Sequence, residues 1–84
     1  MFSELDYRRL CWHSRRGMLE LDLLLMPFVQ HHFKALDLEY QLLYKQLLES
    51  EDQDLFSWLM LRVDPPDRGL GKIVPLILEK VTRS

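Results

Sequence analysis

The chain has 84 residues, of which 48% are hydrophobic and 29% are charged. These proportions are typical of a soluble globular protein and exclude a disordered, collagen-like or membrane-spanning chain. Eleven Lys and Arg against 13 Asp and Glu give a formal charge of -2, which is not the strongly basic balance of proteins that bind nucleic-acid phosphates. We therefore expect one domain spanning 1–84 and no nucleic-acid partner.

The cysteine content and the first residues bear on the compartment. Cys11 is the single cysteine and has no intramolecular disulfide partner, which favours a reducing compartment. The uncharged stretch 23–33 is shorter than the roughly 20 residues that span a bilayer. Residues 1–9 carry charges of both signs with no apolar run behind them, unlike a signal peptide. We expect a cytoplasmic protein that does not insert into a membrane.

Helical periodicity begins close to the start of the chain. Ser3 is expected to cap a first helix that runs to about Arg16 and ends before Gly17. Its apolar face comprises Tyr7, Leu10, Cys11 and Trp12. This face is thin, which predicts that the helix packs on one side only.

The next helix, predicted over about 18–35, is the most apolar part of the chain. Its main stripe comprises Met18, Leu21, Leu25, Phe28 and His32. Apolar neighbours broaden this stripe, so we expect the helix to lie at the centre of the molecule. Pro27 has no N–H to donate to the carbonyl of Leu23, which predicts a bend in the axis.

Two shorter helices are predicted next. Asp37 is expected to cap a third helix that ends at about Leu48, and Ser50 or Asp52 a fourth. The fourth helix is too apolar to stand alone in water, so we expect it to close over the core. Its apolar residues are Leu55, Phe56, Trp58, Leu59 and Met60.

A stiff connection at 64–68 precedes the last predicted helix. The apolar positions of that helix are Leu70, Val74, Ile77 and Val81. Pro75 predicts either a start near Gly71 or Lys72, which places the proline in the first turn, or a bend. Because strand-forming patterns are weak throughout, the predicted fold class is all-α, a small single-domain bundle of about five helices.

Catalytic and metal-binding chemistry has little support in the sequence. The imidazole and thiol groups belong to Cys11, His13, His31 and His32. Their spacings do not place pairs on one helix face, so we expect no metal site. No glycine-rich oxyanion loop accompanies Cys11, and the three glycines form no phosphate-binding loop. We expect no catalytic residue, no enzymatic activity and no cofactor of the chain's own.

The most specific local chemistry lies at 15–22, which reads Arg-Arg-Gly-Met-Leu-Glu-Leu-Asp. One interpretation is structural: arginines end a helix, glycine turns the chain, and acids begin the next helix. The other is a docking site, in which the guanidinium groups of Arg15 and Arg16 and the carboxylates of Glu20 and Asp22 face another protein. Solvent access to these groups distinguishes the two interpretations.

The motif Arg16-Gly17-Met18-Leu19-Glu20 resembles the Arg-Gly-x-x-Glu motif of the succinate dehydrogenase flavinylation factors, the SdhE-type assembly factors. Other segments that resemble the family are Arg15, Leu21-Asp22, Met26-Pro27-Phe28, Leu47-Leu48-Glu49 and the stretch 52–60. The resemblance covers about 7–63, and no motif matches within 65–84. Because the predicted fold begins almost at the start of the chain, we expect the bacterial type.

The resemblance implies a five-helix protein that binds the flavoprotein subunit of succinate dehydrogenase and promotes covalent attachment of FAD to a histidine of that subunit. The flavoprotein of fumarate reductase is a second candidate partner. By the same resemblance Arg16, Gly17 and Glu20 carry the activity. The full set of expected partner-binding residues is Arg15, Arg16, Gly17, Met18, Glu20 and Asp22, with Leu19 beside them. In the later segment, Asp52 and Asp54 are the only residues placed to reach a partner, and the role of this segment in the contact stays open.

The expected mechanism is that of a chaperone, which holds the flavoprotein with its bound FAD and acceptor histidine aligned. A side chain at Gly17 would disfavour a left-handed helix end and obstruct the approach of a partner's backbone. The alternative is an antitoxin-like helical regulatory adaptor that binds a different protein, cytoskeletal or at the membrane. Recovery of the flavoprotein, with flavinylation lost on gene deletion, favours the first function.

Overall fold

The computed structural model describes residues 2–82, so the first residue and the last two of the predicted domain 1–84 lie outside the described part. Within 2–82 the chain forms five α-helices and one 3-10 turn, without a strand. The elements are α1 (Glu4–Ser14), α2 (Leu19–His31), η1 (Phe33–Ala35), α3 (Leu38–Leu47), α4 (Asp52–Leu59) and α5 (Leu70–Thr82). The predicted all-α fold class is confirmed.

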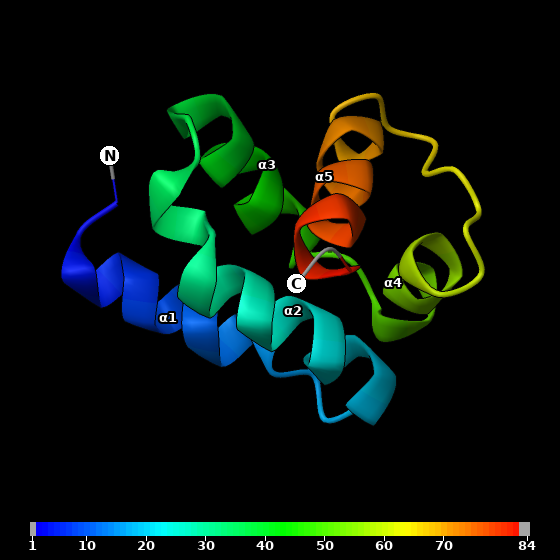
Figure 1. Ribbon diagram of the computed structural model, residues 1–84, viewed down its shortest axis with the longest axis horizontal. Coiled ribbons are helices and arrows are strands. Elements are labelled where there is room, and N and C mark those ends of the chain that lie inside the picture. Colours follow the sequence, from blue (N-terminus) through cyan, green and yellow to red (C-terminus); the bar gives the residue numbers. More distant parts are fainter. Residues whose placement is uncertain (1, 83–84) are drawn as a thin grey trace.

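The helix α2 lies at the centre, as its broad apolar surface predicted. It contacts α1, η1, α4 and α5, and Figure 1 shows α1 beside it and α4 near its N-terminal end. Its buried residues are Leu21, Leu25, Phe28 and Val29. Burial of these side chains removes apolar surface from water, which is the main stabilisation available to a chain of this size.

Tyr44 on α3 occupies the middle of the core. Its ring centroid lies 5.3 Å from that of Phe28 and 5.6 Å from that of Phe33. Its hydroxyl lies 2.6 Å from Oγ of Ser14, which in turn donates to the carbonyl of Leu10 at 2.8 Å. The tyrosine hydroxyl also donates to the carbonyl of Leu25 at 3.5 Å, so it has two partners in the core. Burial raises the pKa of Tyr44, and the Ser14 hydrogen bond opposes that rise only in part.

Helix α1 begins as predicted but ends early. Oγ of Ser3 accepts from the backbone N–H of Asp6 at 3.1 Å, and the Asp6 carboxylate accepts from the backbone N–H of Ser3 at 3.0 Å. The backbone N–H of Ser3, and after it the Ser3 hydroxyl, donate to the Asp6 carboxylate and lower the pKa of that carboxyl. The helix ends at Ser14 rather than Arg16, because Arg16 turns back and donates to the carbonyl of His13 at 3.1 Å.

Helix α2 is shorter at both ends than the predicted 18–35. It begins at Leu19, and it ends at His31, because the backbone of His32 leaves the helical region with φ at -124°. The turn at η1 then buries Phe33 against the Tyr7 and Tyr44 rings. Pro27 lies inside the helix as expected, and the bend in the axis stays a prediction.

The capping predictions for α3 and α4 are wrong in their chemistry. Asp37 is the residue before α3, but its side chain makes no capping hydrogen bond. Glu51, rather than Ser50 or Asp52, is the N-cap of α4, and it too lacks a side-chain bond. The two residues predicted to cap α4 bind Arg16 instead. The carboxylate of Asp52 accepts from Nε of Arg16, and the backbone carbonyl of Ser50 accepts from its Nη2.

The last helix starts earlier than Pro75 suggested. Oδ1 of Asp67 accepts from the backbone N–H groups of Gly69 and Leu70, at 2.7 and 3.1 Å, so the helix begins at Leu70. Pro75 therefore lies in the second turn. The predicted apolar face is largely confirmed, and the buried residues of α5 are Leu70, Ile73, Val74 and Ile77.

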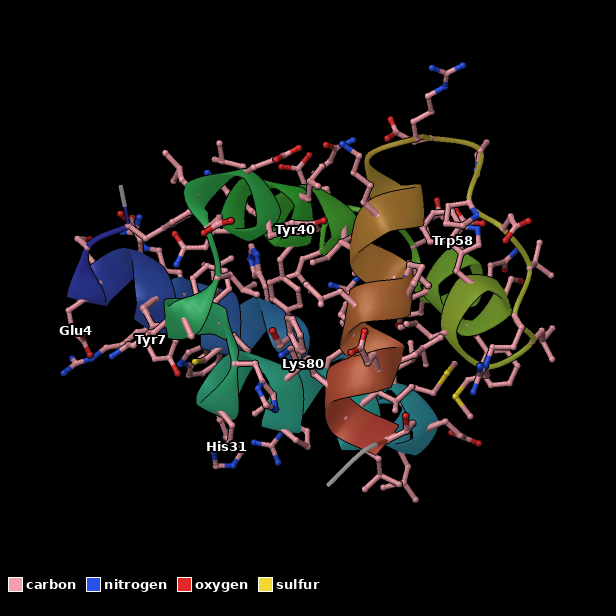
Figure 2. All side chains as sticks on the ribbon, turned by 45° about the horizontal axis from the view of Figure 1, so that its top comes forward. Glu4, Tyr7, His31, Tyr40, Trp58 and Lys80 are labelled. Carbon is pink, nitrogen blue, oxygen red and sulfur yellow. The ribbon has the colours of Figure 1, made fainter. Side chains whose placement is uncertain are left out.

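Two apolar side chains expected to pack inside are exposed. Trp12 is 82% exposed and Met60, just after α4, is 39% exposed. Trp12 lies two positions from the buried Leu10, about 200° around the helix, so the two residues face opposite sides. The rest of the interior is filled from Tyr7 at one end to Trp58 at the other (Figure 2).

No helix among residues 2–82 combines the length and apolar character that crossing a bilayer takes. The same range holds no group of three or more His, Cys, Asp or Glu side chains arranged to bind a metal ion.

Candidate partner-binding site

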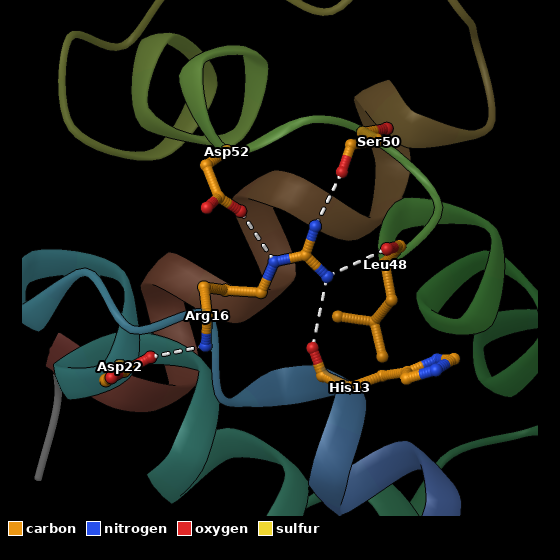
Figure 3. Close-up of polar contacts among 6 residues, drawn as sticks. All are labelled: His13, Arg16, Asp22, Leu48, Ser50 and Asp52. Atoms are coloured by element: carbon orange, nitrogen blue, oxygen red, sulfur yellow. Dashed lines mark hydrogen bonds and ion pairs between the residues drawn. The ribbon is translucent and has the colours of Figure 1, made fainter.

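Arg16 joins the segment between α1 and α2 to the segment between α3 and α4. Its Nε donates to Oδ1 of Asp52 at 2.8 Å, its Nη2 to the carbonyl of Ser50 at 2.7 Å, and its Nη1 to the carbonyl of Leu48 at 2.9 Å. Nη1 also donates to the carbonyl of His13 (Figure 3). Two loops far apart in the sequence are thus held together by one guanidinium group.

This arrangement leaves little of Arg16 for another protein. Its side chain is 16% exposed, and each of its three guanidinium nitrogens already donates within the chain. A single N–H on Nη2 remains to be offered to a partner. The expectation that both guanidinium groups of the motif face solvent is therefore wrong for Arg16.

Asp22 also acts inside the chain. Its Oδ1 accepts from the backbone N–H of Arg16 at 2.8 Å, and its side chain is half-buried in the first turn of α2 (Figure 3). Together these bonds fix the path of the α1–α2 junction, residues 15–18. Met18 is half-buried and packs against the core at the start of α2.

The remaining motif residues face solvent. Arg15, Gly17, Leu19 and Glu20 are all exposed. Gly17 has φ at +83°, the left-handed conformation that sequence analysis predicted there, and nothing lies within 4 Å of the position a Cβ would take. The chain therefore presents one guanidinium, an accessible backbone at Gly17 and one carboxylate on neighbouring turns, supported from behind by Arg16 and Asp22.

The two later acidic residues differ in the same way. The carboxylate of Asp52 binds Arg16, which gives Asp52 a structural role. The Asp52 side chain is also 43% exposed, so part of it is accessible to a partner. Asp54 is exposed on the first turn of α4. The contact between Arg16 and Asp52 was not expected from the sequence, because the two residues are far apart along the chain and no periodic pattern relates them.

Sequence analysis missed an exposed apolar surface beside the junction. Leu19 and Leu23 on α2 are 69% and 62% exposed, and Trp12 projects from α1. A surface hollow of about 290 Å³ lies between the two helices, lined by Cys11, Trp12, Arg15 and Met26. A helical-wheel comparison of Trp12 with Leu10 was the signal in the sequence that could have revealed it.

Comparison with known proteins identifies the family. A family model described as flavinator of succinate dehydrogenase matches residues 8–81. The chain belongs to this family. This match confirms the resemblance carried by Arg16, Gly17 and Glu20 and the function of an FAD assembly factor for succinate dehydrogenase.

Individual relatives match over most of their length. "FAD assembly factor SdhE" of Pseudomonas aeruginosa is 53% identical over 81 residues, covering 96% of each chain. The protein of the same name from Mannheimia succiniciproducens is 45% identical over 78 residues, covering 93% of this chain and 91% of the relative. That of a Serratia species is 44% identical over 69 residues, covering 82% and 78%. The family match extends beyond the motif into α5, where sequence analysis found no resemblance.

Proposed function

We propose that this chain binds the flavoprotein subunit of succinate dehydrogenase through the α1–α2 junction and promotes covalent attachment of FAD to that subunit without being an enzyme itself. The flavoprotein of fumarate reductase is proposed as a second partner. The observation that carries the proposal is the arrangement of the family motif: Arg15, Gly17 and Glu20 lie together on the surface while Arg16 holds their backbone in place.

The proposed contact set is Arg15, Arg16, Gly17, Met18, Glu20 and Asp22, in two roles. Arg15 and Glu20 are exposed and carry opposite charges, so they suit charged hydrogen bonds with a partner. Gly17 leaves open space for a partner's backbone. Arg16, Asp22 and Met18 support this surface from within the fold and contribute at most an edge to the contact.

The proposed chemistry is one of positioning. The flavin supplies its own reactivity, and the bond forms between FAD and a histidine of the partner. FAD is thus bound by the flavoprotein, and no residue of this chain is proposed to hold it. Binding of this chain stabilises the flavoprotein conformation in which FAD and the histidine are aligned. This orientation raises the rate at which the covalent bond forms. The site is suited to this task because it is a rigid surface, fixed at two loops by Arg16.

The test uses the separated flavoprotein subunit, FAD and the full chain, with covalent flavin measured by fluorescence after denaturing electrophoresis. Gly17→Arg and Glu20→Ala should each lower covalent flavin by about tenfold or more while the helical circular dichroism is retained. Equal flavinylation with and without the parent chain contradicts the proposal, and recovery of a different partner with normal flavinylation supports the adaptor alternative.

A matched variant separates backbone strain from blocked contact. Asparagine adopts positive φ far more readily than other residues with a side chain, so Gly17→Asn should fold with little strain yet place a side chain in the open space above the junction. We expect Gly17→Asn to reduce flavinylation at unchanged stability. Two results together would show that the glycine is needed only for its conformation. Gly17→Asn would promote flavinylation normally, and Gly17→Ala would lose this activity only because it unfolds.

A further inference from the structure

An exposed apolar surface runs along α1 and α2 next to the motif. On α2, Leu19, Leu23 and Met26 follow one another at steps of four and three, so they lie on one face of the helix. The hollow between the helices connects Met26 with Trp12 of α1 and with Arg15, the residue that follows α1. Met26, which is half-buried, thus belongs both to the α2 stripe and to the hollow, and we name the set that it joins the Trp12 patch (Trp12, Arg15, Leu19, Leu23 and Met26).

The charge around the patch is positive on its α1 side. Arg8 lies four residues before Trp12 on the same face of α1, and Arg15, the residue after the helix, lines the hollow beside Trp12. Both arginines are exposed, and neither forms an ion pair within residues 2–82. A surface with an aromatic centre and a cationic edge is complementary to an apolar pocket bordered by carboxylates.

We infer that the Trp12 patch is the energetic centre of docking onto the flavoprotein, with Trp12 entering an apolar pocket whose border is acidic. This inference rests on the proposed function and deepens it. The patch adjoins the junction through Arg15 and Leu19, which also flank Gly17, so one partner surface covers both. A tryptophan that is 82% exposed in the free chain has most of its apolar area left to bury on binding.

Two other occupants fit the observations less well. A second copy paired about a two-fold axis would bring the same patch against itself, and the five residues of the patch include no carboxylate to pair with Arg8 or Arg15. An anionic membrane surface would attract these arginines but repel Glu20, which is exposed in the turn that carries Leu19. The flavoprotein is the occupant we infer, because the patch is continuous with the junction that carries the family motif.

The binding test compares the parent chain with Trp12→Ala and Leu23→Ser by calorimetric titration into the flavoprotein subunit. Leu42→Ser on α3 is the matched control, because Leu42 is 52% exposed but lies on a helix outside the patch. We expect Trp12→Ala to raise Kd by about tenfold or more and the control to leave it unchanged. Arg8→Glu should also weaken binding, with the difference shrinking at high salt.

Cys11 provides a footprint of the same surface, since it lines the hollow with Trp12 and is the single cysteine of the chain. Its alkylation by iodoacetamide, followed by peptide mass spectrometry, should slow as the bound fraction rises. Full alkylation in the complex, or an unchanged Kd in Trp12→Ala, overturns the inference. If the parent chain still binds the flavoprotein and promotes flavinylation, the proposed function stands despite that result. Absence of parent binding contradicts the proposed function itself. A dimer, or association with phosphatidylglycerol vesicles, that Trp12→Ala abolishes also overturns the inference.

Discussion

Arg15 and Arg16 are adjacent in the sequence and carry the same side chain, but the fold uses them differently. Arg15 extends into solvent at the end of α1, whereas Arg16 donates to Asp52 and to the carbonyls of Leu48 and Ser50. The backbone path explains the difference, because the extended conformation of Arg15 turns successive side chains to opposite sides of the chain. A motif can therefore require one residue for contact and its neighbour for support.

Substitution of the two arginines should separate these roles. Arg16→Ala removes charge-assisted hydrogen bonds to partly buried carbonyls, and we expect it to lower the free energy of unfolding by about 2 to 3 kcal/mol. Arg15→Ala should change it by less than about 0.5 kcal/mol but reduce flavinylation. Urea denaturation followed by circular dichroism measures both.

Arg16→Lys is the informative intermediate, since lysine keeps the charge but cannot form the planar fork that reaches Asp52, Ser50 and Leu48 together. It should recover only part of the lost stability. Wild-type stability in Arg16→Ala would show that the bonds in Figure 3 contribute little to the fold and that Arg16 serves the partner directly.

At the scale of the element, α5 contains an apparent defect. Pro75 lies in its second turn, so the carbonyl of Gly71 lacks the N–H that would normally bind it. The proline is exposed and the face opposite it carries the buried Ile73 and Ile77. Packing of that face against α2 and α3 holds the helix despite the missing bond.

Replacement of Pro75 should therefore stabilise the protein. Pro75→Ala restores the helical hydrogen bond and removes the ring clash, and we expect the free energy of unfolding to rise by about 1 to 3 kcal/mol, less the entropy that proline removes from the unfolded chain. Thermal unfolding compared with the parent measures the gain. A lower midpoint would mean that the proline ring makes contacts with its neighbours that outweigh the lost bond.

The sequence predicted the elements well because their signals are local. The apolar steps of three and four gave each helix and most of its buried face, as with Leu21, Leu25 and Phe28 on α2. The Ser3 capping box is local too. The misplaced ends of α1, α2 and α4 have a different cause, because Arg16 and Phe33 contact residues remote in the sequence near these ends. The early start of α5 is local, since Asp67 caps it and the prediction relied on Pro75 instead.

The candidate site was predictable in composition but not in orientation. The motif located the α1–α2 junction and the positive φ at Gly17. Which charges face outward depends on the Arg16 network, which joins positions that no spacing relates. Trp12 was assigned to the packed face because four apolar residues within two turns were treated as one face, although residues two apart point to nearly opposite sides.

At the scale of the whole molecule, Tyr44 connects most of the core. Its hydroxyl reaches Ser14 of α1 and its ring contacts Phe28 of α2 and Phe33 of η1. The ring is completely buried, and all described buried side-chain polar atoms, including this hydroxyl, have hydrogen-bond partners. Ionisation of this single group would place a charge among apolar side chains, so the stability of the entire fold depends on its staying neutral.

This dependence predicts a limit to stability at alkaline pH. Burial raises the pKa of Tyr44 above its ordinary value of 10.0, so the unfolded chain loses the proton at a lower pH than the folded chain does. The contribution of the neutral Tyr44 hydroxyl to the free energy of unfolding is fully present below pH 10. Above pH 10 it falls by about 1.4 kcal/mol per pH unit for this one group. Tyr44→Phe should be about 0.5 to 1.5 kcal/mol less stable at pH 7, because it loses the hydrogen bond to Ser14.

Above pH 10 the stability difference between the parent and Tyr44→Phe should shrink, because the variant lacks the buried ionisable hydroxyl. Part of the alkaline loss should persist in the variant, since burial also raises the pKa of Tyr7. Urea midpoints measured from pH 7 to pH 11 for the parent, Tyr44→Phe and the half-buried control Tyr40→Phe test this. Parallel stability curves for the parent and Tyr44→Phe across that range would show that the hydroxyl ionises as readily in the folded core as in the unfolded chain.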